Sequence, residues 1–178
     1  MLLPGPTARI VFRAWRPDDL ALATAIWGDD RVTAFVGGPF TEHQIRDRLA
    51  TELSNQEAHR IAYWPLVVDG ADAGCCGLKR RADKIYELGF YLRVEQWSRG
   101  LAVEAARSVI AFAFDVLAAD ALFAGHHPEN LGSGQILEKL GFRYTHDELY
   151  APTGLHHPGY ELRDHFFPRA TQSSASSL

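Results

Sequence analysis

The stretch "WSRGLAVEAARSVIAFAFDV", which begins at Trp97, joins a glycine turn to a long, alanine-rich apolar segment. The first turn of a helix carries free N–H groups and the positive end of the helix dipole, and both favour an anion. Gly100 would let a ligand approach the backbone there, and Ala102 leaves the approach open. The pattern therefore predicts an anion site of the kind that holds a diphosphate.

Two familiar phosphate loops do not fit this stretch. A Walker A loop needs G-x-x-x-x-G-K-[ST], which the sequence lacks. A dinucleotide fingerprint needs three glycines and a later acid; Asp120 stands 20 residues after Gly100, but the other two glycines are missing. A plain strand-to-helix turn at Gly100 remains the alternative.

The elements that must position this turn follow from the hydrophobic pattern. Strands are predicted at 9–15, 61–70, 73–80, 84–92, 121–127, 142–150 and 159–166, and helices at 18–27, 41–58, 99–118 and 129–140. A loop is predicted at 152–159. Because a helix connects strands 84–92 and 121–127, these two are expected to be parallel. The order predicts a mixed α/β sheet with helices on both faces.

Within these elements, the residues that end or turn the chain are also predicted. Thr41 and Gln44 fit a capping box, Asp69-Gly70 a hairpin turn, and Gly141 the end of a helix. Length and composition indicate a single domain over 1–170, followed by a polar, disordered tail over 171–178.

Composition excludes several classes of function. The formal charge of −4 and a pI of about 6.0 argue against a nucleic-acid-binding surface. No apolar run approaches the roughly 20 residues of a membrane span, and the N-terminus lacks the basic start of a signal peptide. The adjacent Cys75 and Cys76 would face opposite sides of a strand, as small apolar fillers. These features predict a cytoplasmic protein in a reducing compartment, without a membrane partner.

Two further segments give the sequence a family resemblance. With "YELGFYL" at 86–92 and the turn at Trp97, the segment N-x-x-S-x-x-x-L-E-K-L-G-F beginning at Asn130 resembles the GNAT superfamily of acyl-CoA-dependent N-acetyltransferases. The chain looks most like its RimJ/RimL-like branch, which acetylates protein N-termini. The resemblance spans nearly the whole chain, but only the block 86–142 is specific. It implies a twisted, mostly antiparallel sheet of six or seven strands, with the fourth and fifth parallel and splayed.

The resemblance implies that acetyl-CoA is the cosubstrate. The family's pyrophosphate loop falls on Trp97, Ser98, Arg99, Gly100, Leu101 and Ala102. The pantetheine arm would bind the backbone of Phe90, Leu92, Arg93 and Val94, where Val94 replaces a proline common in relatives. Asn130 would bind the CoA arm through its side-chain amide.

The resemblance also suggests catalytic residues. Glu87 would be the general base, directly or through water; alternatively, it is an exposed glutamate paired with Lys84 or an arginine. Glu148 is a second candidate. The usual tyrosine acid is absent, because Leu137 stands at its position. Ser133 would then protonate the leaving thiolate or merely cap the helix. Asn130 has the same capping alternative, and for it a cap and CoA binding can coexist.

The acceptor is an amine, on a peptide N-terminus, an amino acid or another small molecule. The missing tyrosine keeps a non-catalytic acyl-CoA-binding or sensing domain as an alternative. A homodimer is possible, since relatives often form one. His127 is expected near the acceptor. Some aromatic side chains belong either to an acceptor cleft or to the core: Trp27, Phe35, Phe40, Tyr86 and Tyr150. No metal is expected, because neighbouring histidines such as His126 and His127 do not readily converge on one ion.

Overall fold

The computed structural model describes residues 2–167 of the chain. Seven strands form its sheet: β1 (Ile10–Phe12), β2 (Tyr63–Val68), β3 (Ala71–Ala82), β4 (Ile85–Leu92), β5 (Ala121–Gly125), β6 (Arg143–Tyr150) and β7 (Leu155–Leu162). The α-helices are α1 (Leu20–Trp27), α2 (Asp30–Thr33), α3 (Glu42–Ala58), α4 (Leu101–Asp115) and α5 (Leu131–Lys139). The predicted tail, 171–178, lies outside the described residues.

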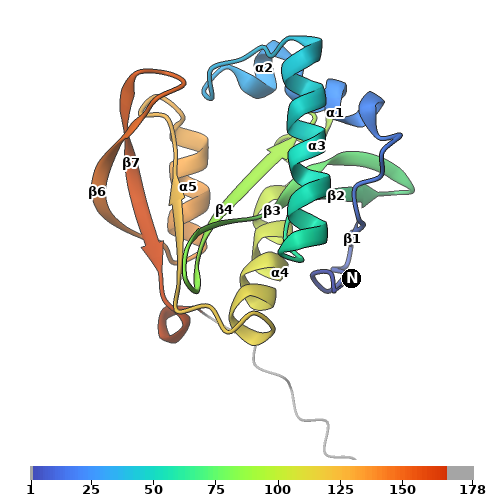
Figure 1. The fold of residues 1–178 in the computed structure, drawn as a ribbon. Helices are drawn as coiled ribbons and strands as arrows, with labels where there is room; N and C mark the ends of the chain where they lie inside the picture. The colour runs from blue at the N-terminus through green and yellow to red at the C-terminus, as the bar shows by residue number, and fades with distance from the viewer. Residues whose placement is uncertain (1, 168–178) are drawn as a thin grey trace, which may run out of the picture.

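The sheet is mixed and has the order β1-β2-β3-β4-β5-β7-β6. Neighbouring strands are antiparallel except for β4 and β5, which are parallel and joined by α4. Helices α1 and α3 lie on one face of the sheet and α4 on the other (Figure 1). The predicted fold class and the parallel pair are therefore confirmed.

The parallel pair of strands opens into a fork. Their pairing runs from Ile85–Ala121 to Glu87–Phe123. Beyond that point β4 continues to Leu92 and β5 to Gly125, with no further pairing between them in the described part of the chain. The backbone groups that face the fork are consequently free to bind a ligand.

Several local predictions hold. Thr41 and Gln44 form a capping box at the start of α3. Asp69 and Gly70 both have positive φ, 51° and 77°, as a tight hairpin turn requires. Gly141 follows α5 with φ 90°, and Phe142 N–H donates to the Leu137 carbonyl across it.

Two elements differ from the predictions. The loop predicted at 152–159 is wrong in its second half, because β7 begins at Leu155 and pairs with β6 from Tyr150–Leu155 onward. The short helix α2 was not predicted; Asp29 caps it by accepting hydrogen bonds from the Arg31 and Val32 N–H groups. Neither element has a hydrophobic period of its own. Pairing with β6 stabilises the start of β7, and the Asp29 cap stabilises α2.

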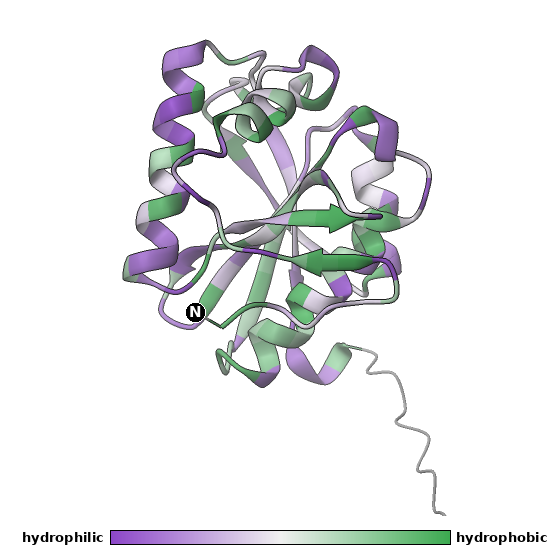
Figure 2. Ribbon diagram, turned by 90° about the vertical axis from the view of Figure 1, so that its right-hand side faces the viewer, coloured by the Kyte–Doolittle hydropathy of each residue, from purple (hydrophilic) through white to green (hydrophobic). Residues whose placement is uncertain are grey.

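The core lies on both sides of the sheet. Cys75 and Cys76 are fully buried although consecutive strand residues face opposite sides, so both faces are covered. Helix α4 buries Leu101, Ala105 and Val109, whereas Val116, just past its end, is half exposed. Interior strands are largely hydrophobic and α3 is largely hydrophilic on its outer side (Figure 2). No helix in residues 2–167 is long and apolar enough to cross a membrane.

Candidate active site

One cavity of about 770 Å³ extends from the start of α4, along the fork between β4 and β5, to the β6–β7 hairpin. This volume is typical of a small-molecule or cofactor site. Helix α5 forms one wall, and α2 with the loop after it forms part of another. The cavity thus joins the predicted anion site to the predicted catalytic residues.

The end of the cavity where the anion site is predicted is built around Gly100, the N-cap of α4. Gly100 has φ 76°, the left-handed conformation that favours glycine, and Ser98 also has a positive φ of 59°. The first turn of α4 has N–H groups without a partner inside the helix, and Trp97, Ser98, Gly100, Leu101 and Ala102 line the cavity beside it.

The side chains of Trp97 and Arg9 hold this loop in place. The Trp97 indole donates a hydrogen bond of 2.9 Å to the Leu92 carbonyl, which ties the loop to the end of β4. Arg9 donates to the Arg99 carbonyl at 2.9 Å and pairs with Glu104 in the first turn of α4. The Arg99 side chain lies outside the cavity and contacts Gln96 and Asp69.

The fork supplies part of the predicted CoA-binding backbone. Phe90 and Leu92 line the cavity. Arg93 and Val94 do not, because the chain turns there into a 3-10 helix, Val94–Gln96, and the Arg93 guanidinium donates to the Asp72 carbonyl. A CoA-binding role remains a prediction for Phe90 and Leu92 as well as for Arg93, Val94 and Arg99.

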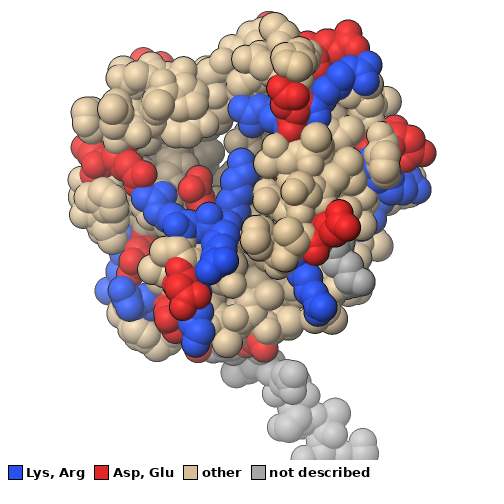
Figure 3. All heavy atoms as spheres, viewed as in Figure 1, with Lys and Arg blue, Asp and Glu red and all other residues tan. Residues whose placement is uncertain are grey.

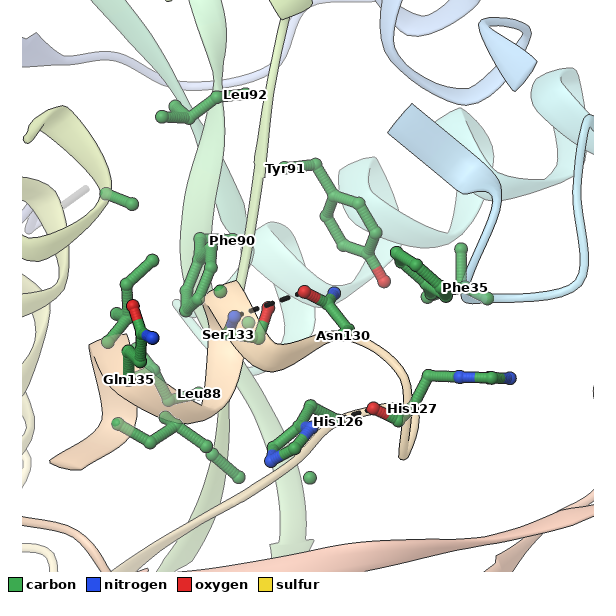
Figure 4. A pocket seen from close by; sticks show the side chains of 18 of the residues that line it. Phe35, Leu88, Phe90, Tyr91, Leu92, His126, His127, Asn130, Ser133 and Gln135 are labelled. Carbon is green, nitrogen blue, oxygen red and sulfur yellow. Dashed lines mark hydrogen bonds between the residues drawn. The ribbon is translucent and has the colours of Figure 1, made fainter. Parts of the chain in front are cut away.

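Asn130 and Ser133 lie together at the start of α5. The Asn130 side-chain oxygen accepts a hydrogen bond of 3.1 Å from the Ser133 N–H, so Asn130 is the N-cap (Figure 4). No described residue donates to the Ser133 hydroxyl, so the capping alternative for Ser133 is wrong. Both residues line the cavity.

Two carboxylates meet at the other end of the cavity. Glu87 of β4 and Glu148 of β6 both line it, and the guanidinium of Arg81 lies between them. Arg81 Nη1 is 3.5 Å from Glu87 Oε2, and Nη2 donates to Glu148. The arginine partner that the sequence allowed for Glu87 is therefore Arg81.

The protonation of Glu87 is set by opposing effects. Burial raises the pKa of this carboxyl above its ordinary value, and the charge of Glu148 adds to the increase. The positive charges of Arg81 and Lys79 oppose it. The pKa of Glu87 remains raised on balance, as suits a carboxylate that accepts a proton from an amine.

Aromatic side chains line the end of the cavity that holds Glu87 and Glu148. Of the residues that the sequence suggested, Phe35, Tyr150 and His127 line the cavity. Tyr150 stacks on His157 with ring centroids 4.7 Å apart, and Phe35 lies 5.0 Å from His127. Tyr91 points toward Phe35 and away from the fork-facing Phe90 (Figure 4). The other suggested residues lie elsewhere: Trp27 stacks on Trp15 in the core, and Phe40 and Tyr86 pack against it.

Sequence reasoning missed Tyr63, Tyr91, Arg81 and His157 as cavity residues. Strand alternation from Glu87 would have found Tyr91, which lies four residues on and on the same face. Among residues 2–167, no group of three or more His, Cys, Asp or Glu side chains could hold a metal ion.

Comparisons with known proteins show the family of this chain. Residues 9–143 match the family model of the acetyltransferase (GNAT) domain. An uncharacterized N-acetyltransferase, p20 from Bacillus licheniformis, is 29% identical over 146 residues, which cover 77% of this chain and 80% of the relative.

Solved structures share the fold at low sequence identity. An acetyltransferase from Agrobacterium tumefaciens is 22% identical with a TM-score of 0.78, covering 92% of this chain and 95% of that one. RimL, a ribosomal-protein alpha-N-acetyltransferase in complex with coenzyme A, is 10% identical with a TM-score of 0.79, covering 90% of this chain and 97% of that one. The family match extends over most of the chain, and this chain belongs to the GNAT family of acetyl-CoA-dependent N-acetyltransferases.

Proposed function

We propose that this enzyme transfers the acetyl group of acetyl-CoA to the primary amine of a peptide N-terminus, by direct attack in a ternary complex. The observation that carries the proposal is the single cavity that connects the N-terminus of α4 with Glu87. On the face shown in Figure 3, the molecule is hollowed between the β6–β7 hairpin and α3. RimL, which shares the fold, acts on a ribosomal protein.

In this proposal the diphosphate of acetyl-CoA binds at the start of α4. The free N–H groups that follow Gly100 face the cavity there, and the helix dipole favours the negative charge. The pantetheine arm pairs with the open side of β4 near Phe90 and Leu92 and reaches Asn130. The thioester then lies beyond the fork, close to Ser133 and Glu87.

The chemistry follows from these positions. Glu87 takes a proton from the acceptor ammonium, directly or through water, and the amine attacks the thioester carbonyl carbon. Backbone N–H groups at the fork stabilise the resulting oxyanion. The C–S bond then breaks, and the CoA thiolate takes a proton from the Ser133 hydroxyl. Ser133 regains a proton from the nitrogen of the new bond, so the product leaves as a neutral amide, and the proton on Glu87 passes to water.

A panel of acceptors tests the function. Acetyl-CoA is incubated with the enzyme and either peptides with free N-termini, the same peptides with blocked N-termini, or small amines, and acetylated products are identified by mass. We expect acetylation of free peptide N-termini only. Acetylation confined to small amines would assign the other acceptor class, and CoA binding without any transfer would support the binding or sensing domain instead.

Ser133→Ala tests the proposed acid. Because Asn130 and not Ser133 caps α5, the variant should melt close to the wild-type temperature. We expect kcat to fall about tenfold to a hundredfold, a modest loss because a thiolate is a good leaving group. Asn130→Ala is the matched control, since losing that cap should cost about 1 kcal/mol of stability. A Ser133→Ala enzyme with wild-type kcat would remove the acid role.

A further inference from the structure

Arg81 occupies an irregular position at the catalytic end of the sheet. The register between β3 and β4 shifts between Arg80 and Ala82, so Arg81 is the extra residue of a β-bulge. Bulges next to active sites commonly redirect a side chain. Here the guanidinium lies over the ring of Phe123, 3.7 Å from the ring centroid. Phe123 is the last residue of β5 that pairs with β4, so Arg81 stands where the fork opens.

The same guanidinium contacts both carboxylates that face the acceptor. Its Nη1 lies 3.5 Å from Glu87 Oε2, and its Nη2 donates to Glu148. The stack on Phe123 fixes the plane of the guanidinium, which leaves separate edges for the two partners. One side chain from β3 thus joins β4, β5 and β6.

We propose that Arg81 is a positioning residue that clamps Glu87 and Glu148 at the acceptor end of the cavity and keeps Glu87 ready to accept the proton. This inference rests on the proposed role of Glu87 as the base. Arg81 itself touches neither the thioester nor the amine in this scheme. It acts through the charge and the orientation of the glutamate.

The surroundings of Glu87 show why an added positive charge matters. The charged and titratable groups that interact with Glu87 come from four strands. They are Arg81 and Lys79 of β3, Glu148 and Tyr150 of β6, Tyr91 of β4 and Tyr63 of β2. His146 Nε2 of β6 lies 3.7 Å from Glu148 Oε2, so a protonated His146 places a second positive charge beside that carboxylate. Burial and Glu148 both oppose ionisation of Glu87, so the two cations of β3 must counter them.

The other basic residues of this segment cannot substitute for Arg81. Lys79 lies over the Tyr63 ring, 4.7 Å from its centroid, and has no carboxylate within ion-pair distance in the described residues. Arg80 lies 3.6 Å from Asp83 in the turn toward β4. Basic side chains gather beside the hollow on this face (Figure 3), but among residues 2–167 only Arg81 pairs with both glutamates.

The test is the pH dependence of kcat/KM for the full chain with acetyl-CoA and an accepted peptide. In Arg81→Gln, removal of the positive charge should raise the pKa of Glu87 further. The acid side of the profile should therefore move to higher pH. At pH 6, kcat/KM should fall about tenfold, whereas at the alkaline plateau it should fall less than about threefold. Arg81→Lys should recover part of the kcat/KM lost at pH 6, because lysine restores the positive charge but cannot contact Glu87 and Glu148 from two separate edges.

Arg80→Gln is the matched control and should keep the wild-type profile, since Arg80 contacts neither glutamate. In a Glu87→Gln background, Arg81→Gln should produce no further movement of the acid side. An unchanged profile in folded Arg81→Gln, or the same movement in the Glu87→Gln background, would overturn the inference. If the wild-type enzyme acetylates no amine, the proposed function fails instead, and the two failures are thereby distinguished.

Discussion

Gly100→Val should abolish measurable binding of CoA and leave the domain folded. The φ of 76° at this position is strained for any L residue and most of all for a β-branched one. The strain costs about 1–2 kcal/mol, less than the roughly 5–15 kcal/mol that stabilises a typical domain. Among the described residues an added Cβ meets only Arg9, at 3.8 Å, and Gly100 itself lines the cavity at the end where the diphosphate is proposed to bind. Calorimetric titration with CoA measures the loss.

Gly70→Val is a closely matched control. Gly70 has φ 77°, nothing lies within 4 Å of an added Cβ, and it sits in the β2–β3 hairpin, outside the cavity. Both variants therefore carry similar backbone strain, and only one of them blocks the proposed diphosphate site. Retained affinity for CoA in Gly100→Val would contradict the anion site, and equal loss in both variants would attribute the effect to strain alone.

Glu87→Gln should lower kcat by about 10²–10⁴-fold at neutral pH, the range expected when a general base is lost. The affinity for acetyl-CoA should change little, because the carboxylate lies at the catalytic end, away from Gly100. Since the pKa of Glu87 is raised, wild-type activity should decline as the pH falls through that value and the base becomes protonated. The difference between variant and wild type should shrink at high pH, where the free amine is abundant. Steady-state rates across pH measure both effects.

Two further glutamates complete this experiment. Glu148→Gln tests the second carboxylate on the Arg81 clamp, and Glu57→Gln, on the exposed side of α3, should leave the rates unchanged. A Glu87→Gln enzyme with wild-type kcat at pH 7 would contradict the assignment. A large loss in Glu148→Gln alone would transfer the role of base to that residue.

The elements that could be predicted from sequence are those with a local cause. The capping box and the helical pattern predicted the start of α3 to within one residue. Strand alternation predicted that Cys75 and Cys76 face opposite sides of β3, and both are buried. The first half of β7 could not be predicted, because "LHHP" resembles a loop and is ordered by its partner β6. Local sequence carries little information about a strand whose hydrogen bonds are made by a distant segment.

In the candidate site, too, the residues that could be predicted are those with a local sequence signal. The turn at Gly100 and the cap at Asn130 are local, and the structure places both on the cavity. Arg81 could not be predicted, because its position depends on a one-residue bulge and on partners from three other strands. Sequence alone suggested Glu87 and Glu148 separately, and only the folded sheet shows that one guanidinium joins them.

The burial of the two cysteines has a practical consequence for following the reaction. Both thiols are completely shielded from solvent, and burial raises their pKa, so almost no reactive thiolate is available at neutral pH. The sequence contains no other cysteine. A disulfide dye added to the folded enzyme should therefore report only CoA released from acetyl-CoA, with no background from the protein. For the same reason, a cysteine introduced on the surface should be the single site of labelling with a maleimide probe.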